Sequence, residues 1–176
     1  MNVDKQLASK IELLILDVDG VLTDGSLFYD NHGQEYKAFN SRDGHGLRML
    51  QDAGVKVAIL TGRKSELVQH RAKNLNIPTE LVFQGFRDKR PAFAALLEHT
   101  SLPAEKIAYI GDDVIDLPVM KQVGLAIAVA DAHPFVKEHA HWVTTRSGGR
   151  GAVRETCEML LDARGQLQAI LDSYLR

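Results

Sequence analysis

Two aspartates, one residue apart, follow an apolar run near the beginning of the chain. Residues 12–17 read ELLILD, and Asp17 and Asp19 stand where this run ends, with Asp24 close behind. Carboxylates are costly to bury unless a metal, a proton or a network of hydrogen bonds compensates them. The stretch therefore predicts either a solvated loop after a strand or a metal-dependent site at the carboxyl end of a buried strand.

Polar side chains also follow three later apolar runs. These runs are VKVAILTG (55–62), ELVFQG (80–85) and KIAYIGDD (106–113). The polar residues at their ends, or shortly after them, are Thr61, Arg63, Lys89, Asp112, Asp113 and Asp116. Segments far apart in the chain thus supply carboxylates, a hydroxyl and an ammonium in the same local setting. One such acid is common by chance, but this convergence indicates a site.

The residue types in this set favour phosphoryl transfer. Carboxylates without histidine or cysteine partners suit a hard cation, of which Mg²⁺ is the usual one. A lysine and the Thr61 hydroxyl add donors for phosphate oxygens, although that hydroxyl could equally cap the next helix. In phosphoryl transfer, catalysis is mostly positioning and charge stabilisation. A carboxylate can itself attack phosphorus, and a second carboxyl two residues later could protonate the leaving oxygen and then activate water.

The elements that must position these residues alternate between strand and helix. We predict strands over 12–17, 55–62, 80–85, 106–113 and 125–131, with a short edge strand over 141–145. We predict helices over 43–53, 65–75 and 89–99, a short helix through Met120, and a closing helix over 151–171. This alternation is typical of an α/β, Rossmann-like fold with a mostly parallel sheet covered by helices on both sides. Such sheets bind ligands at the carboxyl ends of their strands.

Two segments lie outside this alternation. Residues 26–39 (SLFYDNHGQEYKAF) predict a β-hairpin around the turn residues 31–33. Residues 147–155 (SGGRGAVRE) hold three glycines and open a C-terminal segment and helix over 147–176. Glycine lets the backbone approach a ligand closely, so this segment is either part of the active site, with Arg150 contacting an anion, or a plain linker.

Four short motifs, in this order, resemble those of the haloacid dehalogenase superfamily of phosphatases. They are DVDGVLTD (17–24), TGR (61–63), Lys89 and GDDVID (111–116). The resemblance implies that Asp17 is the nucleophile and Asp19 the general acid and base. Thr61 and Lys89 complete the catalytic set that it implies.

The same resemblance implies where a metal ion binds. Mg²⁺ would be held by Asp17, by the main-chain carbonyl of Asp19 and by Asp112. Asp113 and Asp116 are candidates to support either the metal or Lys89. Both alternatives stay open from the sequence.

Longer stretches resemble one family within that superfamily, the 3-deoxy-D-manno-octulosonate 8-phosphate (KDO 8-phosphate) phosphatases. They are FNSRDGHG (39–46), ILTGRKSELVQHRA (59–72), VADAHPFVK (129–137) and SGGRGAVRE (147–155). This resemblance implies a cytoplasmic homotetramer of lipopolysaccharide sugar synthesis that hydrolyses a sugar acid phosphate through an aspartyl-phosphate. The substrate contacts expected with it are Asp19, Asn40, Ser41, Arg42, Asp43, Gly44, Arg48, Arg63, Arg71, Lys89 and Arg150. Arginine suits such a substrate because it pairs with phosphate and carboxylate in bidentate geometry.

The spacing of the motifs predicts a capless enzyme with an open site. Caps of this superfamily lie shortly after the first motif or between the second and third, but residues 25–60 and 62–88 are too few to hold one. We therefore expect a single domain over 1–176 with the hairpin 26–39 protruding from it. Either the substrate is large or neighbouring subunits close the site.

Composition excludes several other classes of protein. The 176 residues are 45% hydrophobic and 25% charged, with a net charge of −2 and one cysteine, Cys157. Neither nucleic acid nor an anionic membrane is an expected partner, and no apolar run approaches the roughly 20 residues of a membrane helix. These features favour a cytoplasmic globular protein. The alternatives are a capless phosphatase for another sugar acid phosphate or a phosphoprotein, and, remotely, a receiver-like signalling domain.

Overall fold

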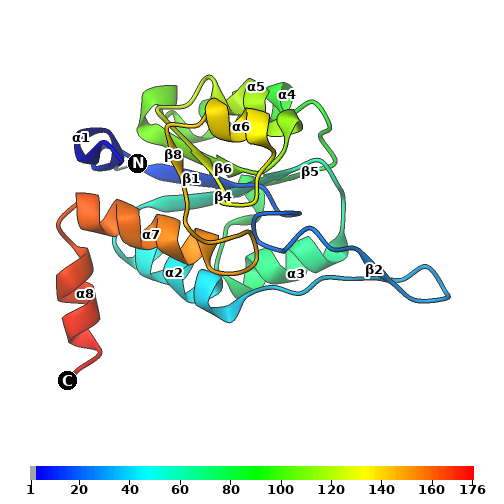
Figure 1. The fold of residues 1–176 in the computed structure, drawn as a ribbon, viewed down its shortest axis with the longest axis horizontal. Coiled ribbons are helices and arrows are strands. Elements are labelled where there is room, and N and C mark those ends of the chain that lie inside the picture. The colour runs from blue at the N-terminus through cyan, green and yellow to red at the C-terminus, as the bar shows by residue number, and fades with distance from the viewer. Residues whose placement is uncertain (1–2) are drawn as a thin grey trace.

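A six-stranded parallel sheet forms the centre of the computed structural model, which describes residues 3–176 (Figure 1). The strand order is β5-β4-β1-β6-β7-β8, and each neighbouring pair is parallel. The strands are β1 (Leu13–Leu16), β4 (Lys56–Thr61), β5 (Val82–Gln84), β6 (Ile107–Gly111), β7 (Leu125–Ala128) and β8 (Trp142–Val143). The predicted α/β fold is confirmed, and the continuous apolar runs at its centre are buried on both faces.

Helices cover both faces of this sheet, as expected from right-handed crossovers (Figure 1). One face carries α2 (Ser41–Asp52), α3 (Glu66–Asn74) and α7 (Ala152–Ala163). The other face carries α4 (Arg90–Thr100), α5 (Leu117–Met120) and α6 (Pro134–Glu138). Short 3-10 turns over Thr79–Leu81, Ala104–Lys106 and Val114–Asp116 link strands and helices. No helix within residues 3–176 has the length and apolar character that crossing a membrane requires.

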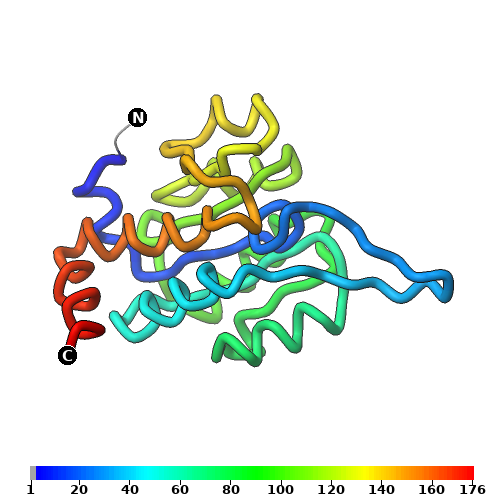
Figure 2. The backbone as a smooth tube through the Cα atoms, turned by 60° about the horizontal axis from the view of Figure 1, so that its bottom comes forward, coloured from blue at the N-terminus to red at the C-terminus, as the bar shows by residue number. Residues whose placement is uncertain are grey.

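The predicted hairpin is present and projects away from the sheet (Figure 2). Its strands, β2 (Phe28–Tyr29) and β3 (Glu35–Tyr36), pair antiparallel and are shorter than the predicted segment. Asp30 closes the turn, because its carboxylate accepts hydrogen bonds from the amides of His32 and Gln34. The hairpin leaves from the end of the first motif and returns to the beginning of α2.

Two helix predictions need correction. The single closing helix predicted over 151–171 is wrong, because α7 ends at Ala163 and a separate helix, α8 (Leu167–Ser173), follows. Gly165 adopts φ +68° there, and the amide of Gln166 bonds back to the carbonyl of Leu161, which terminates the first helix. A short helix, α1 (Lys5–Ala8), was not predicted.

The start of α2 also differs from its prediction, and the reason is local. The helix begins at Ser41, two residues earlier than expected, because the Asn40 side chain accepts hydrogen bonds from the amides of Arg42 and Asp43. This cap fixes the chain where it returns from the hairpin, next to the carboxyl end of the sheet.

Candidate active site

The carboxyl ends of the two central strands bring the first and last motifs together. Strands β1 and β6 pair in parallel with Leu16 opposite Ile110, and the Asp17 amide donates to the Ile110 carbonyl at 3.1 Å. Asp17 and Asp112 therefore leave adjacent strands at the same edge. Asp116 joins them through the 3-10 turn that follows β6.

Asp17, Asp112 and Asp116 form a cluster of carboxylates fit for a divalent cation. Each offers a carboxylate oxygen, and these oxygens lie within 4.8 Å of one another. Asp17 and Asp116 are buried and Asp112 is half-buried. An oxygen-only donor set of this kind suits Mg²⁺. The predicted ligands Asp17 and Asp112 are thus brought together.

Burial makes the carboxyls of Asp17 and Asp112 weaker acids than usual. Burial raises the pKa of Asp17 to about 7, and the charge of Asp116 adds to this effect against the opposing ammonium of Lys89. Burial likewise raises the pKa of Asp112 to about 8, with further contributions from Asp116, Asp17 and Asp113. A cation among the carboxylates would favour their ionised forms. The electrostatics therefore agree with the donor set.

Lys89 is fully buried beside the cluster and contacts three groups. Its Nζ lies 2.5 Å from Asp116 Oδ1, 3.1 Å from Asp17 Oδ1 and 2.9 Å from the hydroxyl of Tyr109. Burial lowers the pKa of Lys89, but the charges of Asp17 and Asp116 outweigh it, and the pKa lies above its ordinary value. An ammonium held next to Asp17 can donate to a phosphate group there.

The two supporting candidates have different environments. Asp116 is buried, contacts Lys89, and accepts hydrogen bonds through Oδ2 from the amides of Asp112 and Asp113. The Asp113 side chain is exposed, and its Oδ1 accepts from the amide of Val114 at the start of the 3-10 turn. Asp116, rather than Asp113, is therefore the residue that holds Lys89.

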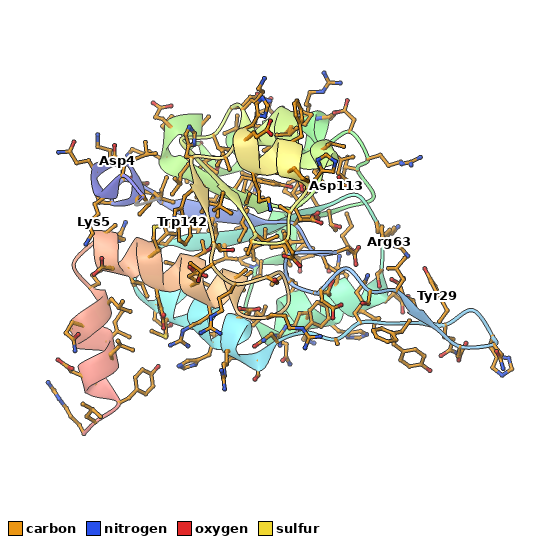
Figure 3. The ribbon with its side chains drawn as sticks, viewed as in Figure 1. Asp4, Lys5, Tyr29, Arg63, Asp113 and Trp142 are labelled. Atoms are coloured by element: carbon orange, nitrogen blue, oxygen red, sulfur yellow. The ribbon has the colours of Figure 1, made fainter. Side chains whose placement is uncertain are left out.

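The Asp19 side chain is turned toward the hairpin. Its Oδ1 lies 2.5 Å from the Nζ of Lys37, and its Oδ2 lies 3.8 Å from the Nε of Arg63. Arg63 in turn donates to the hydroxyl of Tyr29 at 2.7 Å, and the two side chains lie side by side at the hairpin (Figure 3). Thr61, the last residue of β4, is buried at the same sheet edge.

Part of the predicted substrate set lines one cavity next to this edge. The cavity has a volume of about 360 Å³ and is lined by Asp24, Ala38, Phe39, Asn40, Ser41, Arg42, Gly149 and Arg150. Arg150 Nη2 donates to Asp24 Oδ2 at 2.9 Å, and the side-chain Nδ2 of Asn40 donates to the carbonyl of Gly149. The structure thus brings Asn40, Ser41, Arg42 and Arg150 together.

The other predicted contacts on α2 and α3 do not line that cavity, but Arg71 adjoins it, because its Nη2 donates to the carbonyl of Asn40 at 3.1 Å. Asp43 is 1% exposed and accepts from the Arg154 amide at the start of α7. Arg71 stacks on the Phe39 ring at 5.3 Å. Gly44 packs against Arg71, since a Cβ there would lie 2.5 Å from its Nη2. Arg48 donates to the Asn74 carbonyl at the end of α3.

The glycine-rich segment packs directly on the loop of the first motif. The Gly149 amide donates to the carbonyl of Val21, and Gly149 itself adopts φ +63°. A Cβ on Gly148 would lie 1.7 Å from the carbonyl oxygen of Gly20. The segment therefore packs against the first-motif loop, and its residues Gly149 and Arg150 line the cavity described above.

Comparisons with known proteins agree with these observations. The family model of the haloacid dehalogenase-like hydrolases matches residues 80–154. The chain is 54% identical over 160 residues to the 3-deoxy-D-manno-octulosonate 8-phosphate phosphatase KdsC of Escherichia coli, across 91% of this chain and 84% of that protein. The chain belongs to this phosphatase family.

Solved structures in this family have the same fold. A 3-deoxy-D-manno-octulosonate 8-phosphate phosphatase from Yersinia pestis is 51% identical, with a TM-score of 0.90, over 93% of this chain and 88% of that one. The enzyme from Moraxella catarrhalis, solved with a magnesium ion, a phosphate ion and KDO, is 39% identical. Its TM-score is 0.93, over 97% of both chains.

The sequence interpretation of this KDO 8-phosphate phosphatase family member did not assign four residues to the site. They are Tyr29, Glu35, Lys37 and Tyr109. Tyr109 lies inside an apolar strand, where an aromatic residue indicates core packing. The hairpin residues carry one available signal, the same-face spacing of Glu35 and Lys37 in a strand, but nothing in the sequence indicates that this face turns toward Asp19.

Proposed function

We propose that this chain hydrolyses KDO 8-phosphate to KDO and inorganic phosphate in a Mg²⁺-dependent reaction through an aspartyl-phosphate at Asp17. The observation that carries the proposal is the buried group of Asp17, Asp112, Asp116 and Lys89 at the carboxyl edge of the sheet. It occurs in a chain 54% identical to a KDO 8-phosphate phosphatase.

In the first half of the reaction, a carboxylate oxygen of Asp17 attacks phosphorus. Val18 N–H and Lys89 both contact Oδ1 of Asp17, at 2.7 and 3.1 Å, which orients the carboxylate. The bond between phosphorus and the sugar oxygen breaks, and that oxygen takes a proton from Asp19. Lys89 and Thr61 donate to the transferred phosphoryl oxygens.

In the second half, water hydrolyses the aspartyl-phosphate. Asp19, now a carboxylate, takes a proton from the attacking water, and the bond between phosphorus and the Asp17 oxygen breaks. Asp17, Asp112 and the main-chain carbonyl of Asp19 would hold Mg²⁺, which would supply positive charge to offset the negative charge of the phosphoryl group.

The cavity beside the sheet edge provides a place for the sugar acid. Arg42 and Arg150 are the cationic residues of its lining, and Asn40 and Ser41 are polar neighbours. Guanidinium groups pair with carboxylates in bidentate geometry. We assign the sugar carboxylate and hydroxyls to this cavity, with Arg63 nearer the phosphate. Asp43, Gly44, Arg48 and Arg71 support the walls behind it.

Phosphate release from purified protein tests the function. KDO 8-phosphate with Mg²⁺ is expected to be the preferred substrate over other sugar acid phosphates and over phosphopeptides. Asp17→Asn is expected to abolish turnover while leaving the thermal melting curve unchanged, because an amide cannot form the aspartyl-phosphate. A different preferred substrate would redirect the assignment, and an active Asp17→Asn protein would overturn the mechanism.

A homotetramer is a further part of this proposal. The hairpin exposes large apolar side chains, namely Leu27, Phe28, Tyr29 and Tyr36. Apolar patches of this kind on a protruding element favour self-association, and neighbouring hairpins could close a site that lacks a cap. We further propose that residues 1–176 form one domain that acts in the cytoplasm, with 26–39 as the protruding hairpin and 147–176 as the C-terminal segment.

A further inference from the structure

Lys37 lies between two carboxylates at the base of the hairpin. Its side chain is 1% exposed, with Nζ 2.5 Å from Asp19 Oδ1 and 2.8 Å from Glu35 Oε1. Glu35 and Lys37 are two residues apart in an extended segment and so point to the same side. The hairpin therefore delivers an ammonium and a carboxylate together to a loop of the active site.

Arg63 adds a second cation to this group. Its Nε lies 3.8 Å from Asp19 Oδ2, and its Nη2 lies 3.3 Å from Glu35 Oε1. Lys37 and Arg63 thus approach different oxygens of Asp19, which fixes the rotation of the carboxylate and not only its position. Glu35 contacts both cations and holds them close to Asp19.

Removal of the ammonium would leave Asp19 close to another acid. Glu35 and Asp19 both lie within 3 Å of the same Nζ, so without it two carboxylates face each other with only Arg63 to separate them. The loss of one partner from a buried ionic group is costly because the remaining charges are uncompensated. The Asp19 carboxylate would then move away from Glu35.

We propose that Lys37 is a positioning residue that holds the carboxylate of Asp19 in place for proton transfer, with Glu35 holding Lys37 in turn. The inference rests on the proposed role of Asp19 as general acid and base. Proton transfer needs heavy atoms about 2.6–3.2 Å apart, and a displacement of about 1 Å can cost about 10²-fold in rate. The hairpin, which carries no atom of the first motif, thereby controls the proton-transfer step.

The choice of leaving group separates this role from general damage to the site. The sugar leaves KDO 8-phosphate as an alkoxide that must be protonated, whereas p-nitrophenyl phosphate releases a phenolate that needs no proton. Lys37→Met is expected to lower the first-turnover rate of KDO release from KDO 8-phosphate, measured with enzyme in excess, by about 10- to 100-fold. The first-turnover rate of phenolate release from p-nitrophenyl phosphate should fall by less than about threefold in Lys37→Met and in Asp19→Asn, because this leaving group needs no acid. Later turnovers should slow on both substrates, because water attack on the aspartyl-phosphate still needs Asp19 as the base.

Three further variants control for folding and for charge. Lys37→Arg keeps a cation and is expected to recover most of the activity on KDO 8-phosphate. Lys106→Met removes a lysine from an exposed pair with Glu12 before β6, and it should affect neither substrate. Adding Lys37→Met to Asp19→Asn should cause little further loss, because both act on the same step.

Each result either supports or overturns the positioning role of Lys37. Equal losses in the first-turnover rate on both substrates in Lys37→Met, or a fully additive double variant, would overturn the positioning role while leaving the phosphatase assignment intact. If Lys37→Met does not fold, Glu35→Gln, which weakens the contact that holds Lys37, carries the test through the same leaving-group pattern. An Asp19→Asn protein without leaving-group selectivity in the first turnover would overturn the acid role, and the positioning role with it.

Discussion

At the scale of single residues, the hydroxyl of Tyr109 stands out among the groups around Lys89. It is fully buried at the middle of β6, donates to Asp116 Oδ1 at 2.6 Å and accepts from Lys89 Nζ at 2.9 Å. The aromatic ring also lies 5.6 Å from the same ammonium. A buried network in which each member has partners is rigid, so Tyr109 fixes the ammonium that faces Asp17.

We expect Tyr109→Phe to weaken phosphate binding without disrupting the fold. The substitution removes one hydrogen bond from Lys89 and one from Asp116, at a cost of about 1–3 kcal/mol in unfolding free energy. The inhibition constant of inorganic phosphate should rise about 3- to 10-fold because Lys89 is held less firmly. Tyr174→Phe, at an exposed site just after α8, is the matched control. Unchanged inhibition by phosphate in the Tyr109 variant would contradict this role.

The sequence was informative for residues that follow apolar runs and less so for the groups that surround them. Asp17, Lys89 and Asp112 stand at or after strand ends, where parallel strands meet, so their convergence could be predicted. Lys37 and Glu35 come from a hairpin whose orientation depends on packing. Asp43 and Arg71 stay predicted substrate contacts that rest on resemblance; in the structure Asp43 also accepts from the Arg154 amide and Arg71 stacks on Phe39.

At the scale of elements, buried strands were predicted well and helix ends less well. Strand β1 lies between β4 and β6, and all four of its residues are buried. A continuous apolar run is therefore enough to predict it from the sequence. The start of α2 depends on one side chain, Asn40, and the break between α7 and α8 depends on the left-handed conformation of Gly165. Such local caps shift boundaries by one or two residues without changing the fold.

The glycine-rich segment gives a prediction at the element scale. Gly148 has no room for a side chain, since a Cβ would lie 1.7 Å from the Gly20 carbonyl oxygen, and its amide is held by Asp131. Gly148→Ala must therefore push this segment away from the loop that carries Asp19. We expect a loss of about 1–3 kcal/mol in unfolding free energy and a fall of about tenfold or more in kcat/KM.

A variant at a second glycine, Gly54, serves as a control that loses stability without losing activity. Gly54 adopts φ +88° after α2, at the opposite edge of the sheet, and a Cβ there meets nothing within 4 Å. Gly54→Ala should destabilise the protein through backbone strain, by about 1 kcal/mol or more, but leave kcat/KM unchanged. Thermal melting and phosphate release, measured on both variants, distinguish the two effects. Equal activities would remove the segment 147–151 from the site.

At the scale of the whole molecule, the acidic cluster links stability to pH. The pKa of Asp17 is raised to about 7 and that of Asp112 to about 8, from an ordinary value of 3.8, mainly by burial. Both carboxyls hold a proton more tightly in the folded chain than in the unfolded chain. In metal-free protein, their contribution to stability is present below about pH 4 and is lost as the pH rises through 7 and 8.

Mg²⁺ is expected to restore that stability. Because the metal requires ionised ligands, its binding releases protons and strengthens as the pH rises. The melting temperature should rise on adding Mg²⁺ more at about pH 8 than at about pH 6, and EDTA should reverse the rise. Asp112→Asn should abolish the effect. Calorimetry in matched buffers measures it, and an equal rise at both pH values would contradict the assignment of the metal to these carboxylates.

Assembly is the last property that belongs to the whole molecule, and the hairpin makes it testable. Phe28 is 54% exposed at its edge, among other exposed apolar side chains on a two-stranded element whose outer edges are unpaired within residues 3–176. Packing against copies of the same chain would cover both the unpaired strand edges and the exposed apolar side chains.

We expect light scattering to give the mass of a homotetramer. Phe28→Asp should lower that mass and reduce activity on KDO 8-phosphate, because the capless site then loses its neighbours. Phe135→Asp, a matched aromatic 48% exposed on α6, should leave the mass unchanged. A wild-type monomer with full activity would show that the open site needs no neighbour.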